Sequence, residues 1–157
     1  MGRWLTHRDY SERLMEHYRH PRNAGELPNA DAVVTVGNPL HGDVMQLSLR
    51  VVDGRVAEAR FKAFGCAVAI AAGSVTTELI QGLSLDDLDG FSDSRVVEAL
   101  GGVPVAKMGC SVLAEKAMRE ALAICRSRQE DQGRAIGFEE SIRGTAASSA
   151  SGAPSRR

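Results

Sequence analysis

The stretch Phe64-Gly65-Cys66-Ala67-Val68-Ala69-Ile70-Ala71-Ala72-Gly73-Ser74 joins the end of a strand pattern to the start of an apolar helix. Gly65 ends the strand, and the helix that Cys66 opens is expected to reach Gln81, with Gly82 as its C-terminal cap. A cysteine at a helix N-terminus lies beside unpaired backbone N–H groups and the positive end of the helix dipole, which favour the thiolate. We therefore take the Cys66 thiol as the point around which fold and chemistry are organised.

The composition indicates one domain and excludes several classes of function. A chain of 157 residues that is 43% hydrophobic is long enough for one domain with a core. The 19 Lys and Arg nearly balance the 20 Asp and Glu, so nothing drives general nucleic-acid binding. No apolar run is long enough to span a membrane or to form a signal-peptide core, so we expect a cytoplasmic protein without membrane contact. The three cysteines do not form a disulfide framework, which favours metal or thiol chemistry.

The N-terminal region predicts one helix. Thr6 and Asp9 fit a capping pattern, apolar residues then recur at helical spacing, and Pro21 stops the helix after His20. The histidines in or beside this helix have no cysteine or acid at a metal-binding spacing, so we interpret them as surface or partly packed residues.

Three strands are expected next, at 32–36, 44–52 and after the turn Asp53-Gly54. A two-residue turn would place Glu58 and Arg60 on the apolar face of the preceding strand. A three-residue loop, with Gly54 in the left-handed conformation of a bulge, instead brings Ala57, Ala59 and Phe61 to that face. The other face is then solvated, so helices must cover the apolar one.

Two short helical segments are expected near residues 84–87 and 93–100, and a longer helix at 112–125. Cys110 repeats the arrangement of Cys66 at the start of this last helix, whereas Cys125 shares its apolar face and is interpreted as a core residue. Residues 1–126 are therefore predicted to form the domain. Residues 127–157 are polar and rich in small residues, and we expect a disordered tail.

Four side chains at the ends of expected elements are candidate metal ligands: His41, Asp43, Cys66 and Cys110. An imidazole, a carboxylate and two thiolates suit zinc or an iron-sulfur cluster. Their spacing alone leaves a second interpretation open, in which His41 is a loop residue and the two cysteines are simply buried at helix starts.

Several motifs resemble the U-type scaffold proteins of iron-sulfur cluster assembly, the NifU N-terminal domain and IscU. The resemblance runs in order from Tyr10 to Cys125. It is carried by Tyr10-Ser11-Glu12, His17-Tyr18, Pro21-Arg22-Asn23-Ala24-Gly25, Gly42-Asp43-Val44-Met45, Phe61-Lys62-Ala63-Phe64-Gly65-Cys66, Ala69-Ile70-Ala71, Thr77-Glu78-Leu79, Lys107-Met108 and Cys110-Ser111-Val112-Leu113.

The resemblance implies an α+β fold with a small, three-stranded antiparallel sheet and helices packed on one face. It also implies a non-enzymatic scaffold that receives persulfide sulfur from a cysteine desulfurase, combines it with iron, and passes a transient 2Fe-2S cluster to apo acceptor proteins. By position, Asp43 matches the family's aspartate, and Cys66 and Cys110 match its second and third cysteines. Cys110 corresponds to the usual sulfur acceptor.

The chain departs from the family pattern at three places. His41 stands where the family has its first cysteine, and Gly109 replaces the histidine before the third. Val103-Pro104-Val105-Ala106-Lys107 is only a partial match to the segment that chaperones bind, which weakens the expectation of a chaperone partner.

The exchange at position 41 has physical consequences. An imidazole ligand leaves a bound cluster less negative than a thiolate would, and it must be unprotonated to bind. We therefore hypothesise a site formed by His41, Asp43, Cys66 and Cys110 that holds a cluster, iron or zinc and is labile to acid. The alternatives are a degenerate zinc- or iron-binding partner module of a cysteine desulfurase and, as an enzyme, a thiol sulfurtransferase that uses Cys110.

Overall fold

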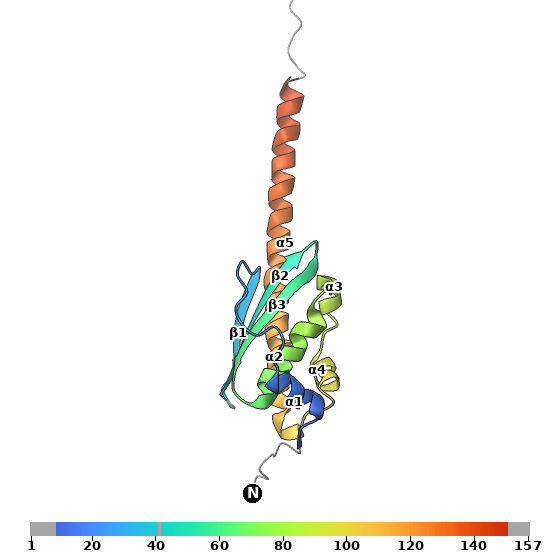
Figure 1. Cartoon of the computed structure of the whole chain (residues 1–157). Coiled ribbons are helices and arrows are strands. Elements are labelled where there is room, and N and C mark those ends of the chain that lie inside the picture. The colour runs from blue at the N-terminus through green and yellow to red at the C-terminus, as the bar shows by residue number, and fades with distance from the viewer. Residues whose placement is uncertain (1–8, 41, 151–157) are drawn as a thin grey trace, which may run out of the picture. The chain divides into compact units, whose positions relative to one another are not determined.

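The computed structural model describes residues 9–40 and 42–150, and the described residues divide into two compact units after Cys125. The elements of the described residues, labelled in Figure 1 except for the 3-10 helix η2, follow one another along the chain. They are α1 (Glu12–Arg19), β1 (Ala32–Asn38), β2 (Asp43–Val52), β3 (Arg55–Phe64), α2 (Ala67–Ile80), α3 (Leu85–Leu88), α4 (Asp93–Ala99), η2 (Val105–Lys107) and α5 (Met108–Ala150).

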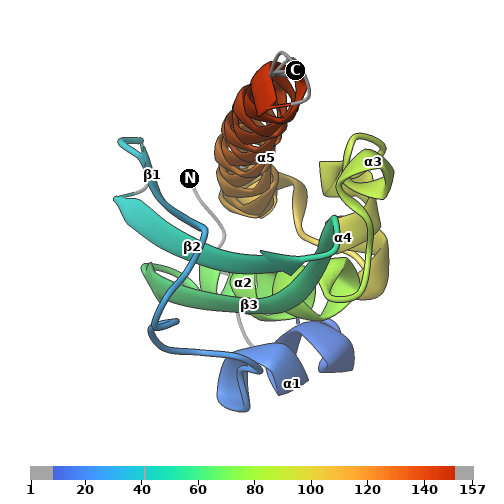
Figure 2. The ribbon, with the colours of Figure 1, turned by 90° about the horizontal axis from the view of Figure 1, so that it is seen from above.

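The three strands form one antiparallel sheet in the order β1-β2-β3. Helix α2 packs against β3, and α1 packs against α2 (Figure 2). Alternate residues of each strand are buried in a single core together with apolar residues of α1, α2, α4 and α5. The buried apolar residues of the strands are Ala32, Val34, Val36, Met45, Leu47, Leu49, Val56, Ala59 and Phe61. This arrangement confirms the predicted α+β fold, because period-two burial leaves one sheet face for helices to cover.

The register shift of the β2–β3 hairpin lies at a different position from the one we predicted. Its turn has only two residues, Asp53 and Gly54, and both have positive φ angles of 53° and 74°, as in a type I′ turn. The register shifts instead between Arg50 and Val51, so that Ala57 is the extra residue of a bulge in β3. Ala59 and Phe61 therefore face the core as predicted, whereas Ala57 is exposed.

Helix α1 begins later than predicted. Its N-cap is Ser11, whose hydroxyl accepts a hydrogen bond of 3.0 Å from the backbone N–H of Leu14. The predicted cap at Thr6 lies outside the described residues. The predicted end before Pro21 is confirmed.

Helix α2 is buried on nearly all sides, as its apolar sequence predicted. Gly73 lies directly against the ring of Phe61, because a Cβ atom built on Gly73 would be 2.4 Å from Phe61 Cδ2. This close approach fixes the distance between α2 and β3. The close contact between Gly73 and Phe61 thereby positions α2 relative to β3.

Helix α5 begins at Met108 and ends at Ala150. The predicted end at Cys125 is therefore wrong. Its first part is buried along one face that includes Cys125, which confirms the core role of that residue. Residues 127–135 are exposed, and they lack proline and contain many Arg, Gln and Glu, which favour a helix. We expected a disordered tail from residue 127 onward, but the structure describes a helix as far as Ala150. No helix among residues 9–40 and 42–150 combines the length and apolar character needed to cross a bilayer.

Candidate metal centre

Three elements bring three of the four predicted ligands together. Asp43 is the first residue of β2, Cys66 is the N-cap of α2, and Cys110 lies in the first turn of α5. One carboxylate oxygen and the two Sγ atoms all lie within 4.8 Å of one another. Residues far apart in the sequence thus present a compact set of donor atoms.

The Asp43 carboxylate fixes the start of α2. Its Oδ1 accepts a hydrogen bond of 2.9 Å from the backbone N–H of Cys66, and its Oδ2 lies 3.8 Å from Cys66 Sγ. The Asp43 side chain is only 1% exposed, so these contacts stabilise a charge that is largely removed from water.

Gly65 makes room for this carboxylate. Its φ angle is +145°, and a Cβ atom at this position would be 1.9 Å from Asp43 Oδ1 and 2.7 Å from Asp43 Cγ. Residues with a side chain rarely adopt this φ value, so glycine suits the position in conformation as well as in space. The group that approaches it closely is the carboxylate itself.

The two thiols have different environments. Cys66 is partly exposed, whereas Cys110 is 0% exposed. Burial raises the pKa of the Cys110 thiol, and hydrogen bonding to Asp43 and to Cys66 raises it further. The predicted likeness between the two positions is therefore only partial, because Cys110 lies two residues inside its helix and in a setting that favours the neutral thiol.

His41, the fourth predicted ligand, lies outside the described residues. The strands on either side are paired down to Asn38 and Asp43, and the Gly42 N–H donates to the Asn38 carbonyl at 2.8 Å. The Asn38 side-chain amide also donates to the carbonyl of Gly109 at 3.3 Å. The described base of this loop thus contacts the residue before Cys110, and the role of His41 stays a prediction.

Tyr10 belongs near the centre, although the sequence showed it only as part of a motif. Burial raises the pKa of its phenol, nearby Lys107 opposes this, and negative charge at Cys66 or Cys110 adds to the rise. Arg22, another motif residue, pairs through its guanidinium with Glu16 at 3.1 Å and with Glu78 at 3.4 Å.

Apolar side chains are exposed on the segments that carry the donors. Val44, at the start of β2, and Phe64, at the end of β3, are cross-strand neighbours with 42% and 77% of their surface exposed. Exposed apolar residues adjoin the other donor positions as well, namely Leu40, Val105 and Val112. We call these five residues the apolar rim.

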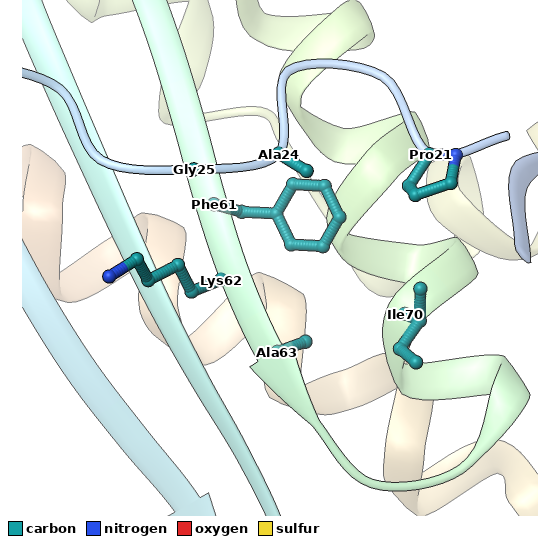
Figure 3. A pocket seen from close by; sticks show the side chains of 7 residues that line it. All are labelled: Pro21, Ala24, Gly25, Phe61, Lys62, Ala63 and Ile70. Carbon is teal, nitrogen blue, oxygen red and sulfur yellow. The ribbon is translucent and has the colours of Figure 1, made fainter.

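A separate pocket of about 310 Å³ opens between β3 and α2. Figure 3 shows Phe61, Ala63 and Ile70 bordering it, with Pro21 and Ala24 of the preceding loop. Lys62 and Gly25 complete the lining, and the Lys62 ammonium pairs with Glu26. None of the described donors lines this pocket.

The NifU-like N terminal domain family matches residues 9–132, and the chain belongs to this family. Among its relatives, the iron-sulfur cluster assembly scaffold protein IscU of Escherichia coli K12 is 42% identical over 125 residues, covering 77% of this chain and 97% of the relative. The protein named IscU 1 of Archaeoglobus fulgidus is 43% identical over 113 residues, covering 72% of this chain and 74% of the relative.

Solved structures share the fold. The N-terminal part of a NifU-like protein from Brucella abortus has a TM-score of 0.63 at 21% identity, covering 74% of this chain and 94% of that one. A SUF-system protein from Fervidobacterium islandicum has the same TM-score and identity, with coverage of 75% and 99%.

Proposed function

We propose that this protein is a scaffold on which iron-sulfur clusters are assembled. The observation that carries the proposal is the set of one carboxylate and two thiol donors within 4.8 Å, formed by Asp43, Cys66 and Cys110. Relatives matched over nearly their whole length carry the name of such scaffolds. Thiolates are the usual protein ligands of iron-sulfur clusters, so the donor set suits this cargo.

The cargo is a transient 2Fe-2S cluster bound by Asp43, Cys66, Cys110 and His41. Because the neutral imidazole of His41 stands in place of a thiolate, the cluster is less negative than an all-cysteine cluster and has a higher reduction potential. Cys110 must lose its proton on binding iron, so assembly releases protons and strengthens with rising pH.

Cys110 holds the sulfur before assembly. A cysteine desulfurase carries the sulfane sulfur as a persulfide, and thiol exchange moves this sulfur to Cys110 while the desulfurase recovers its thiol. Two electrons from an external reductant then convert the sulfane sulfur to sulfide and restore the Cys110 thiol. The completed cluster passes to apo acceptor proteins.

The apolar rim supports docking of the desulfurase at the donor site. Phe64 and Val105 are 77% and 90% exposed and so are open to contact with a partner. A partner that covers them also excludes water from the donors, where sulfur transfer takes place.

The exchange of cysteine for histidine at position 41 favours a second candidate, a zinc- or iron-binding partner module that builds no cluster. Only two of the four proposed ligands are sulfur, and an imidazole and a carboxylate also suit zinc. The two candidates differ in one observable property, the formation of a sulfide-bridged cluster.

Anaerobic reconstitution with iron, cysteine and a desulfurase tests the proposal. We expect visible cluster absorption in the wild type, loss of it in Cys66→Ala and Cys110→Ala, and its retention in Cys125→Ala. Cys125 is the matched control because it is a buried cysteine of α5, about 22 Å along the helix from Cys110. Tight zinc binding without cluster absorption in the wild type would reject the scaffold and support the partner module.

A further inference from the structure

The outer edge of β3 is paired along only part of its length. The loop before β1 joins this edge, because the Phe61 N–H donates to the Asn23 carbonyl at 3.0 Å and the Gly25 N–H donates to the Phe61 carbonyl at 2.8 Å. Ala24 and Phe61 thus form a parallel bridge outside the named strands. No bridge to Ala63 follows among the described residues, so the loop leaves the edge after Gly25.

Ala63 is the next position of this edge, and it is open. Alternate residues of a strand direct their backbone groups to the same side, and those of Phe61 point outward to the loop, so those of Ala63 also point outward. Within the part of the chain that the structure describes, the Ala63 N–H and C=O have no hydrogen-bond partner on this side. An unpaired strand edge of this kind is a template for pairing with another strand.

The pocket of about 310 Å³ lies directly beside the open edge. Figure 3 shows the side chains of Phe61, Ala63 and Ile70 on the pocket side, whereas the Lys62 side chain points away from it. All lining residues except Lys62 are uncharged, and the volume is at the lower end of the range of about 300–1,000 Å³ that is typical of ligand pockets. The space therefore suits one large apolar side chain.

We propose that the β3 edge at Ala63 and the adjoining pocket form a docking site for an extended segment of a partner protein. The segment adds a short strand to the sheet and carries an apolar side chain next to an acidic one. Main-chain pairing at a sheet edge with alternate side chains in pockets is a known mode of peptide recognition. The inference goes beyond the scaffold function and holds whether or not the metal centre builds a cluster.

The alternation of side chains along a strand defines which residues the segment needs. When its backbone pairs with Ala63, one side chain enters the pocket and the next lies on the same face as Lys62. The Lys62 ammonium pairs with Glu26, but these side chains are 48% and 77% exposed, so the ion pair contributes little and a partner's carboxylate can replace Glu26. Charge complementarity therefore selects an acid at the second position.

The docking site adjoins the metal centre without including its donors. Ala63 lies three residues before Cys66, and the Ile70 N–H donates to the Cys66 carbonyl at 3.3 Å, one helical turn along α2. A bound segment therefore brings the rest of its protein close to the centre. The two unpaired backbone groups of Ala63 match a peptide, which favours a protein partner over a free apolar molecule.

Amide hydrogen exchange in the wild type tests the open edge without any variant. We expect the Ala63 amide to exchange at least about tenfold faster than the Phe61 amide, whose N–H is bonded to Asn23. Equal protection of the two amides would mean that a segment of this chain or a second copy already covers the edge, and it would overturn the proposal.

Synthetic peptides test the chemistry of the partner. The probe is a fluorescent, threonine-rich peptide with a central Leu-Glu pair, and the matched peptides carry Leu-Lys or Ala-Glu instead. By fluorescence polarisation, we expect the Leu-Glu peptide to bind at least about fivefold more tightly than either matched peptide. Its binding should also slow hydrogen exchange at the Ala63 amide.

Three variants of the full chain separate the contacts. Lys62→Glu should reverse the preference, so that the Leu-Lys peptide binds more tightly than the Leu-Glu peptide. Ala63→Pro removes the outward N–H and should weaken binding about fivefold, while an edge strand tolerates proline at such a position. Lys116→Glu changes an exposed lysine of α5 and should leave binding at the wild-type level.

Three results with the peptides would overturn the proposal. They are a failure of the Leu-Glu peptide to bind the wild type, an unchanged preference in Lys62→Glu, and binding that leaves exchange of the Ala63 amide unaltered. Each of these results leaves cluster assembly by the wild type untouched. Failure of the wild type to form a cluster would conversely reject the scaffold and leave the docking site standing.

Discussion

Replacing Gly65 with alanine tests how the buried carboxylate of Asp43 and the start of α2 are held together. The new Cβ atom would be 1.9 Å from Asp43 Oδ1 and 3.1 Å from Asp43 Cα, so the carboxylate must leave its position. A residue with a side chain at φ +145° is also strained.

The expected cost follows from these two effects. The backbone strain costs about 1–3 kcal/mol. Loss of the hydrogen bond between the Cys66 N–H and the charged carboxylate costs about 1.5–3 kcal/mol more. We therefore expect Gly65→Ala to lower the free energy of unfolding by about 2.5–6 kcal/mol in total.

Gly82→Ala is the matched control. Gly82 has a φ angle of +86°, and a Cβ atom there would have nothing within 4 Å, so only backbone strain of about 1–2 kcal/mol is expected. Urea unfolding of the metal-free proteins measures both costs. Titration with Co²⁺, whose thiolate complexes absorb light, should show affinity about 10–100-fold weaker in Gly65→Ala and unchanged in Gly82→Ala. Equal unfolding free energies, or wild-type Co²⁺ affinity in Gly65→Ala, would refute the reasoning.

Three further predictions concern packing and pH. Gly73→Ala would place a Cβ atom 2.4 Å from the buried ring of Phe61, so we expect a net loss of about 1–2 kcal/mol in unfolding free energy, measured in urea. Burial lowers the pKa of His17, so the contribution of neutral His17 to the stability of the metal-free protein should be fully present above about pH 6.5 and lost as the pH falls through the lower folded-state pKa, as followed by unfolding at several pH values. Ligation by neutral His41 predicts that the reconstituted cluster is lost between about pH 8 and pH 5.5, as followed by visible absorption.

Each of these predictions has its own control. Gly133→Ala, in an exposed part of α5 with nothing near the new Cβ atom, should not destabilise the protein, and equal effects at Gly73 and Gly133 would contradict the packing argument. His17→Gln should reduce the loss of stability at low pH, and an unchanged pH profile would remove His17 as its cause. Cluster retention that is the same in His41→Ala at every pH would remove His41 from the site.

The periodic parts of the fold were predictable from the sequence. Alternation in β2 fixed which face carries Met45, Leu47 and Leu49, and the apolar run after Cys66 predicted the buried helix α2. The position of the bulge was not predictable, because moving the register shift from the turn to Ala57 leaves Ala59 and Phe61 on the same face. Pattern alone cannot distinguish these two solutions.

The sequence selected three residues that lie together in the candidate centre, but it did not reveal the geometry of the centre. Residue type and the family resemblance selected Asp43, Cys66 and Cys110, and the sheet and two helix starts bring them together. The different burial of the two thiols depends on packing around α5, which a loop-to-helix pattern does not reveal. The closeness of Tyr10 likewise arises from tertiary contacts and leaves no signal in spacing.

The central claim is that these donors hold a cluster built of iron and sulfide. Mössbauer spectroscopy of protein reconstituted anaerobically with isotopically enriched iron tests it most directly. We predict the spectrum of a spin-coupled two-iron cluster in the wild type and in Cys125→Ala, and its absence in Cys66→Ala. A spectrum of mononuclear iron alone in the wild type, or an unchanged cluster in Cys66→Ala, would contradict the claim.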